Sequence, residues 1–132
     1  MSIPMSPFLR NTLLADAATG AIAAVPTIAA SGFLSALLGI PAWLVFWAGI
    51  ALVPVVAFLL AMAGRGAVPR AWLREIVVIN GAWAIASFGV LAFGLVSPNA
   101  LGTLFIVAQA LAVGVFAALQ FSVLRAARPL VA

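Results

Sequence analysis

The stretch Ala63-Gly-Arg-Gly-Ala-Val-Pro-Arg-Ala-Trp-Leu-Arg-Glu75 decides how this chain folds, because it is the only charged interruption in the middle of an apolar sequence. It holds three of the six arginines of the chain. A bilayer with a hydrocarbon core of about 30 Å is crossed by about 20 residues of helix. The apolar sequence on each side of the stretch is long enough for two such crossings. The stretch therefore predicts a loop between two pairs of membrane-spanning helices.

The composition supports a lipid environment. Hydrophobic residues make up 67% of the 132 residues and charged residues only 6%, whereas soluble domains carry about 25% charged residues. The mean hydropathy is +1.36. The formal charge of +4 comes from arginine alone. No basic stripe with interleaved aromatic residues is present, so the sequence does not predict nucleic-acid binding.

The residue types that carry most enzyme chemistry are missing. The chain has no cysteine, histidine or tyrosine, and only two acidic residues. This excludes disulfides, thiolate or imidazole metal sites, and serine–histidine or cysteine–histidine nucleophiles within the chain. We therefore expect a non-enzymatic protein without a cofactor or a metal site.

We predict an all-α fold in a single domain over residues 1–132, an antiparallel bundle of four transmembrane helices. The expected spans cover residues 13–38, 42–63, 76–96 and 100–124. Pro26 lies inside the first span and is expected to kink it. Residues 1–10 predict a short irregular lead-in, in which Pro7 suits the first turn of a helix. A cleaved signal peptide is not expected, because Asp16 interrupts the apolar region and the apolar run continues past the usual length.

The arginines predict the orientation of the spans. They all fall before the first span, between the second and third, or after the fourth: Arg10, Arg65, Arg70, Arg74, Arg125 and Arg128. The turns Gly39-Ile-Pro41 and Ser97-Pro98-Asn99 carry no charge. Because arginine accumulates in short cytoplasmic segments, both termini and the central loop are expected to be cytoplasmic.

Polar residues inside the spans form two expected layers. Counted at 1.5 Å per residue from the arginine-bearing end, three of them lie at nearly equal depth, roughly 5–6 Å in: Asp16, Asn80 and Gln120. A second layer lies roughly 16–23 Å in: Thr27, Ser87 and Gln109. Helical spacing places the members on one face of each helix, so the two layers predict an intramembrane polar network.

The network has two interpretations. In the first, the polar side chains hydrogen-bond between helices and fix their packing, at about 0.6 kcal/mol per bond, and Asp16 pairs with Arg74 or Arg125. In the second, they line a polar path through the bundle with Asp16 at its inner gate. The outer half of the bundle offers only Ser31 and Ser35 for such a path, with no second buried acid.

Two further surfaces are expected to make contacts. On the fourth span, small residues recur at every fourth position and predict a face for helix packing or for a partner: Ala110, Gly114, Ala118 and Ser122. Five arginines are expected to contact anionic lipid headgroups, at about 1 kcal/mol per basic residue: Arg65, Arg70, Arg74, Arg125 and Arg128.

Five segments carry a resemblance to small bacterial four-helix integral membrane proteins: Leu13-Leu-Ala-Asp16-Ala, Leu37-Leu-Gly-Ile-Pro41, Asn80-Gly-Ala-Trp83, Pro98-Asn-Ala-Leu-Gly102 and Phe105-Ile-Val-Ala-Gln109-Ala. This resemblance implies a multi-pass protein of the bacterial inner (cytoplasmic) membrane. It implies no catalytic or binding role for any residue.

Two functions are expected from these observations. The first is an accessory or scaffold subunit that packs against another integral membrane protein or against a second copy of itself, with membrane lipids as its surroundings. The second is a small oligomeric transporter or channel with a route along Asp16, Thr27, Asn80 and Gln109. A cavity filled with water would favour transport, and polar faces that bond to each other would favour the scaffold.

Overall fold

The computed structural model describes residues 1–127, and these are almost entirely helical. In chain order the elements are β1 (Ser2–Pro4), α1 (Pro7–Ala29), α2 (Ser31–Leu38), α3 (Ala42–Ala63), β2 (Ala67–Pro69), α4 (Arg70–Ala92) and α5 (Ala100–Ala126). Four of them, α1, α3, α4 and α5, are long and apolar enough to cross a membrane. The expectation of a helical protein with four such helices is confirmed.

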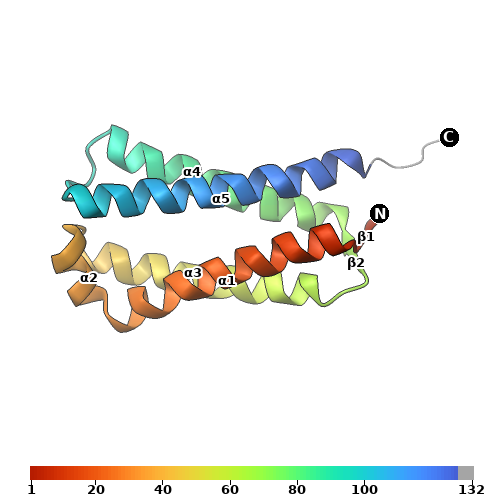
Figure 1. The fold of residues 1–132 in the computed structure, drawn as a ribbon, viewed down its shortest axis with the longest axis horizontal. Helices are drawn as coiled ribbons and strands as arrows, with labels where there is room; N and C mark the ends of the chain where they lie inside the picture. The colour runs from red at the N-terminus through yellow and green to blue at the C-terminus, as the bar shows by residue number, and fades with distance from the viewer. Residues whose placement is uncertain (128–132) are drawn as a thin grey trace.

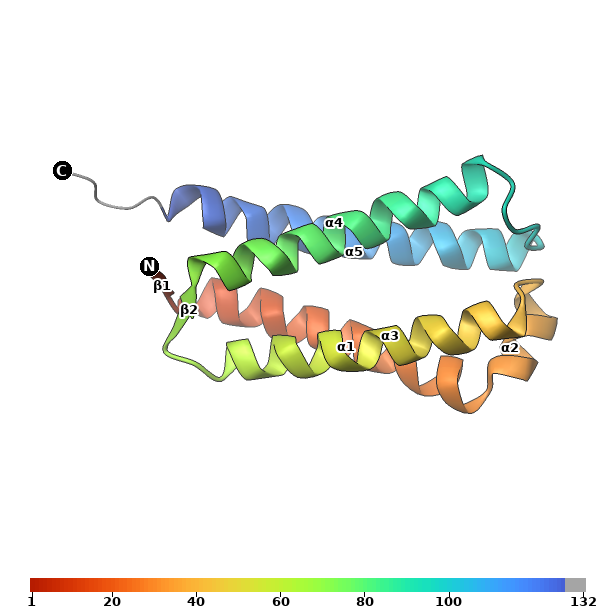
Figure 2. The ribbon, with the colours of Figure 1, turned by 180° about the vertical axis from the view of Figure 1, so that it is seen from behind.

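The helices form two hairpins that lie alongside each other (Figure 1). In the first hairpin α1 packs along α3, and α2 caps one end; in the second hairpin α4 packs along α5. Seen from behind, the same two pairs remain separate layers (Figure 2). The N-terminus, β1, β2 and the end of α5 lie at one end of the molecule, here called the charged end. The other end, with α2 and the α4–α5 connection, is called the turn end.

Residues 1–10 are more ordered than the sequence suggested. Ser6 caps α1, because its Oγ accepts a hydrogen bond from the Leu9 backbone N–H at 3.1 Å, and Pro7 occupies the first turn as expected. Before it, β1 pairs antiparallel with β2, with Ile3 opposite Val68. Both of these side chains are buried. The expected irregular lead-in is therefore wrong: hydrophobic contact and strand pairing fix the start of the chain onto the loop before α4.

The first expected span is divided into two helices. α1 continues past Pro26 to Ala29, and the chain leaves helical geometry at Ala30, with φ −131° and ψ 37°. Pro26 has no N–H to donate and so weakens the hydrogen-bond ladder, but its carbonyl still accepts from Ala30 N at 2.8 Å. The break therefore falls one turn after the proline. α2 then ends at Gly39, whose φ of +71° is the left-handed conformation that glycine adopts without strain.

Other helix ends also differ from the expected spans. α4 begins at Arg70 instead of residue 76 and ends at Ala92 instead of 96, while α5 continues to Ala126. The charged residues Arg70, Arg74 and Glu75 belong to the helix, since arginine and glutamate are good helix formers. The connection after α4 uses Gly94, whose φ is +64°.

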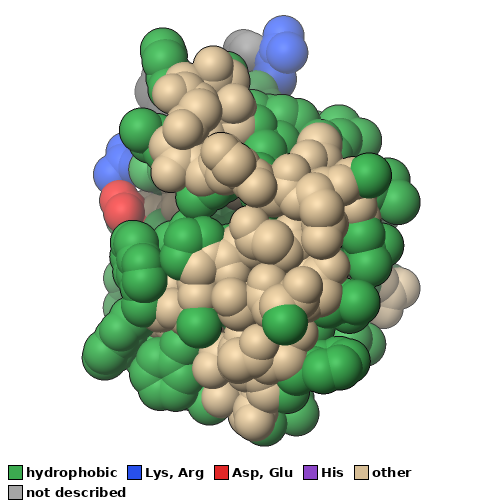
Figure 3. All heavy atoms as spheres, turned by 90° about the vertical axis from the view of Figure 1, so that its left-hand side faces the viewer, with side chains coloured by type: hydrophobic (Ala, Val, Ile, Leu, Met, Phe, Trp, Pro, Cys, Tyr) green, Lys and Arg blue, Asp and Glu red, His purple; other side chains and the backbone are tan. Residues whose placement is uncertain are grey.

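The buried core is small and the surface is largely apolar. One cluster at the charged end joins both hairpins and both strands through residues such as Leu9, Leu59, Val68 and Leu73. Large hydrophobic side chains are exposed all along the helices, with Ile22 at 74% and Ile85 at 75%. The view onto the turn end shows hydrophobic and uncharged groups in front and the charged side chains behind (Figure 3). In water such a surface would be unstable, whereas in hydrocarbon it is the expected one.

Candidate functional site

A buried polar cluster joins the two hairpins near the charged end. Asn80 Nδ2 on α4 donates hydrogen bonds to Asp16 Oδ2 on α1 and to Gln120 Oε1 on α5, each at 2.8 Å. Gln120 Nε2 donates to the same oxygen of Asp16, also at 2.8 Å. All three residues are buried, with Gln120 at 0% exposure. We call these residues the Asp16 cluster, and it places together the three residues that the sequence put at one depth.

The cluster forms without an arginine. Arg74 and Arg125, the expected ion-pair partners of Asp16, are both exposed, and the Asp16 carboxyl group is bonded to two side-chain amides instead. Amides satisfy the acceptor without bringing a second charge into an apolar interior, where charge is costly. Each bond in the cluster links different helices, so the cluster fixes where α1 lies against α4 and α5.

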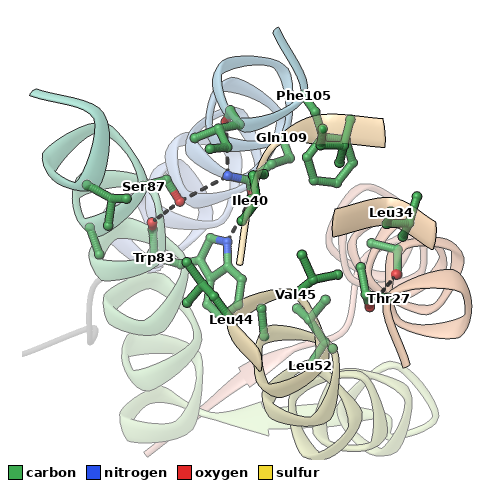
Figure 4. Close-up of a pocket in the computed structure, with 17 residues that line it drawn as sticks. Thr27, Leu34, Ile40, Leu44, Val45, Leu52, Trp83, Ser87, Phe105 and Gln109 are labelled. Carbon is green, nitrogen blue, oxygen red and sulfur yellow. Dashed lines mark hydrogen bonds between the residues drawn. The ribbon is translucent and has the colours of Figure 1, made fainter. Parts of the chain in front are cut away.

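A second polar cluster lies within the α4–α5 hairpin. Trp83 Nε1 donates to Gln109 Oε1 at 2.8 Å, and Gln109 Nε2 donates to Ser87 Oγ at 2.9 Å and to the Ile106 carbonyl at 3.0 Å. Ser87 Oγ in turn donates to the Trp83 carbonyl at 2.7 Å. We call this the Gln109 cluster (Figure 4). It includes Ser87 and Gln109 as the sequence suggested, and it adds the indole N–H of Trp83.

Thr27 does not join the Gln109 cluster. It lies on the far side of the cavity in Figure 4, and its hydroxyl donates to the carbonyl of Ala23 in its own helix at 2.7 Å. Its role is packing: a Cβ added at Gly49 on α3 would clash with the Thr27 side chain. Gly49 is therefore needed for the close approach of α1 and α3. The deeper layer expected from the sequence is divided between the two hairpins.

The hairpins are joined again at the turn end through Asn99, which the sequence analysis did not single out. Asn99 Nδ2 donates to the Leu37 carbonyl at 2.8 Å, and its backbone N–H donates to the Leu38 carbonyl at 3.1 Å. Its Oδ1 caps α5 by accepting from Gly102 N at 2.8 Å. Asparagine before an apolar helix signals an N-cap. Its bonds to α2 depend on tertiary structure and have no sequence signal.

Between these two junctions a cavity of about 240 Å³, open to the protein surface, lies between the hairpins. We call it the interhairpin cavity (Figure 4). All five helices contribute to its wall, which is almost wholly apolar and includes Leu34, Val45, Leu52 and Phe105. The polar groups on the wall belong to Thr27 and the Gln109 cluster, which are bonded within the protein. A smaller space of about 170 Å³ lies between α3 and α4 beside Asn80.

Three arginines of residues 1–127 bond to backbone carbonyls near the charged end, two of them at helix ends. Arg10 Nε donates to the Ala63 carbonyl at 3.0 Å, at the end of α3, and Arg70 donates to the Ala127 carbonyl, at the end of α5. Arg65 Nε donates to the Ala67 carbonyl at 3.2 Å, and its guanidinium lies 5.5 Å from the Trp72 ring centroid. A cation at a helix C-terminus satisfies free carbonyls and complements the helix dipole.

Of the expected headgroup contacts, Arg65, Arg70, Arg74 and Arg125 thus lie together at the charged end. Arg74 and Arg125 are exposed on helices that pack against each other. Arg128 lies outside the described residues.

The small-residue face of α5 is only partly used inside the protein. Ala110 is fully buried, and a Cβ at Gly114 would lie 4.0 Å from the Ala84 Cβ on α4. Ala118 and Ser122 are exposed. Ala110 therefore lies in the interior and Gly114 faces α4, while the last two positions face outward.

Within residues 1–127, no group of three His, Cys, Asp or Glu side chains could hold a metal ion. The described site is thus two internally bonded polar clusters and an apolar cavity. Comparisons of the chain with protein-family models, with curated proteins and with solved structures find no match.

Proposed function

We propose that this chain is a non-enzymatic subunit of the bacterial inner membrane that packs against a larger integral membrane protein or against a second copy of itself. The observation that carries the proposal is the pairing of the polar side chains with each other. Both polar clusters are bonded within the protein. In this arrangement they hold helices together and leave no polar wall for a solute route.

The proposed orientation has all four long helices antiparallel across the bilayer and both termini in the cytoplasm. The arginines of the described residues support it, since they belong to the elements at the charged end, while the connection of Gly39, Ile40 and Pro41 is uncharged. Exposed tryptophans support the same two interfaces. Trp43 and Trp47 begin α3 near the turn end, and Trp72 lies in the first turn of α4 at the charged end.

A partner is supported by small residues that face outward. A Cβ added at Gly81 or Gly89 of α4 would meet nothing within 4 Å. Ala118 and Ser122 of α5 are exposed as well. Small residues at a lipid-facing surface let a second helix approach closely, which drives association where the hydrophobic effect between helices is absent. A partner helix against α4 or α5 would use them.

The proposal is tested by extraction of the protein from its source membrane in a mild detergent, followed by size analysis and mass spectrometry. We expect the chain to migrate with another integral membrane protein or as an oligomer. Ala118→Trp should disrupt this assembly. Ala18→Trp, on the exposed side of α1 at a similar distance from the charged end, is the matched control and should leave it intact.

Two results would refute a packing role. One is a monomer that carries no other protein in every mild detergent used. The other is solute flux in reconstituted vesicles that Asp16→Asn abolishes while the variant remains folded, which would support a transporter or channel instead.

A further inference from the structure

Packing against a partner protein does not explain the interhairpin cavity. It is open to the protein surface, and its wall offers almost nothing but hydrocarbon. The few polar groups on that wall already have partners, since Gln109 bonds to Trp83 and Ser87, and Thr27 bonds to its own helix. Water in such a cavity would lack the two to four hydrogen bonds that it needs. The occupant that fits this wall is therefore apolar.

The cavity is built into the fold in a specific way. Gly49 lets α3 lie close to α1, and after the break at Ala30 α2 places Leu34 and Leu38 on the cavity wall. The Asp16 cluster joins the hairpins on one side of the cavity, and Asn99 joins them on the other. The hairpins thus meet at both ends and stay apart between them.

The length and position of the cavity match one leaflet of a bilayer. On α3 its wall runs from Leu44 to Leu52, a rise of about 12 Å at 1.5 Å per residue. Half of the hydrocarbon core of a bilayer is roughly 15 Å thick. The wall begins at Leu38 and Ile40, beside the turn end, and reaches inward to Thr27 and Trp83. In the proposed transmembrane orientation it therefore spans the depth that the lipid chains of the turn-end leaflet occupy.

We propose that the interhairpin cavity binds one hydrocarbon chain of a membrane lipid from the leaflet at the turn end. The chain enters from the surrounding hydrocarbon, which the exposed apolar faces of the helices contact. The headgroup stays outside at the turn end, where the protein offers no charge to select it. Recognition therefore rests on the shape and apolar character of the chain, and the site does not discriminate between headgroups.

The test uses the full-length protein in dioleoyl phosphatidylcholine vesicles that contain a phosphatidylcholine with a photoactivatable diazirine near the end of one chain. After illumination, adducts are mapped by mass spectrometry. We expect adducts on cavity-lining residues such as Leu52 as well as on exposed residues such as Val53. Ala48→Trp places an indole in the cavity and should abolish the adducts at Leu52 while those at Val53 remain. Ala51→Trp, on the exposed face of the same helix, should change neither.

A second measurement is independent of whether Ala48→Trp folds. The chain has no cysteine, so Ala48→Cys gives a single thiol with little change in volume. In the same vesicles a charged, membrane-impermeant thiol reagent should not label it, whereas Gly66→Cys in the exposed loop should react in permeabilised vesicles. Labelling of Ala48→Cys at the rate of Gly66→Cys would show a water-filled cavity and overturn the proposal. Wild-type adducts on Val53 without adducts on the cavity wall would overturn it as well. Neither result depends on a protein partner, so the proposed packing role is tested separately.

Discussion

Replacing Asn80 by leucine removes the residue that joins three helices, and the structure gives the size of the effect. Asn80 makes one hydrogen bond to the Asp16 carboxyl group and one to Gln120. Losing two interhelical bonds in a membrane costs about 0.6 kcal/mol each, and leaving the buried Gln120 Oε1 without its donor adds roughly 1–3 kcal/mol. Asn80→Leu should therefore lower the free energy of unfolding by about 3 kcal/mol, on the order of a hundredfold in the equilibrium constant.

Ser87→Ala is the matched control on the same helix. It removes the hydroxyl that accepts from Gln109 within one hairpin, at a cost of about 0.6 kcal/mol. The assay is reversible unfolding of the full-length chain in mixed micelles with increasing denaturing detergent, followed by circular dichroism. A double-mutant cycle adds Asp16→Leu, and in that background Asn80→Leu should cost less by about 0.6 kcal/mol, the average for an interhelical bond in a membrane. Additive costs, or equal shifts for Asn80→Leu and Ser87→Ala, would refute the bond between the hairpins.

Three further outcomes follow from other contacts. Gly49→Ala should lower the free energy of unfolding by roughly 1–3 kcal/mol in the same assay, because the added Cβ would clash with Thr27. Gly81→Ala is the control: its added Cβ meets open space, so the free energy of unfolding should stay equal or rise by up to about 1 kcal/mol. Equal effects of the two substitutions would contradict the α1–α3 packing. Arg10→Gln should lower the free energy of unfolding by about 1 kcal/mol, because it removes the cation that bonds the Ala63 carbonyl at the end of α3, and this loss should shrink in high salt. A loss that does not change with salt would contradict an electrostatic interaction between Arg10 and the helix end. Reporter fusions at residue 66 and at the C-terminus should both be cytoplasmic, and a periplasmic signal from either would overturn the proposed orientation.

The sequence predicted well those features that depend on one helix at a time. Four apolar helices follow from length and composition. The common depth of Asp16, Asn80 and Gln120 follows from counting residues from the arginines, because helical rise is fixed. Helix ends and breaks follow less closely from the sequence of one helix. Pro26 signalled a disturbance, but the helix continues past it and breaks one turn later, at Ala30.

Features that depend on how the hairpins meet could not be predicted from the sequence. Thr27 lies at the depth of Gln109, yet the cavity separates them, and depth alone carries no information on lateral position. The bonds from Asn99 to α2 and the pairing of β1 with β2 join segments about 60 residues apart. That Asp16 bonds to side-chain amides instead of Arg74 or Arg125 also depends on how the hairpins meet. Counting charges in the sequence identifies the arginines that could pair with Asp16, but it does not show whether any of them lies near it.

The pairing of β1 with β2 has a consequence for the biogenesis of the protein. Ser2 faces Pro69, and the Arg70 amide donates to the Met1 carbonyl, so β1 is synthesised before the first hairpin and its partner β2 only after it. Until β2 emerges, β1 has no partner strand, although α1 and α3 have already been synthesised. The strand thus closes the first half of the molecule into a loop at the moment the second half begins to emerge. An early folding unit that ends at the start of α4 is built into the order of synthesis.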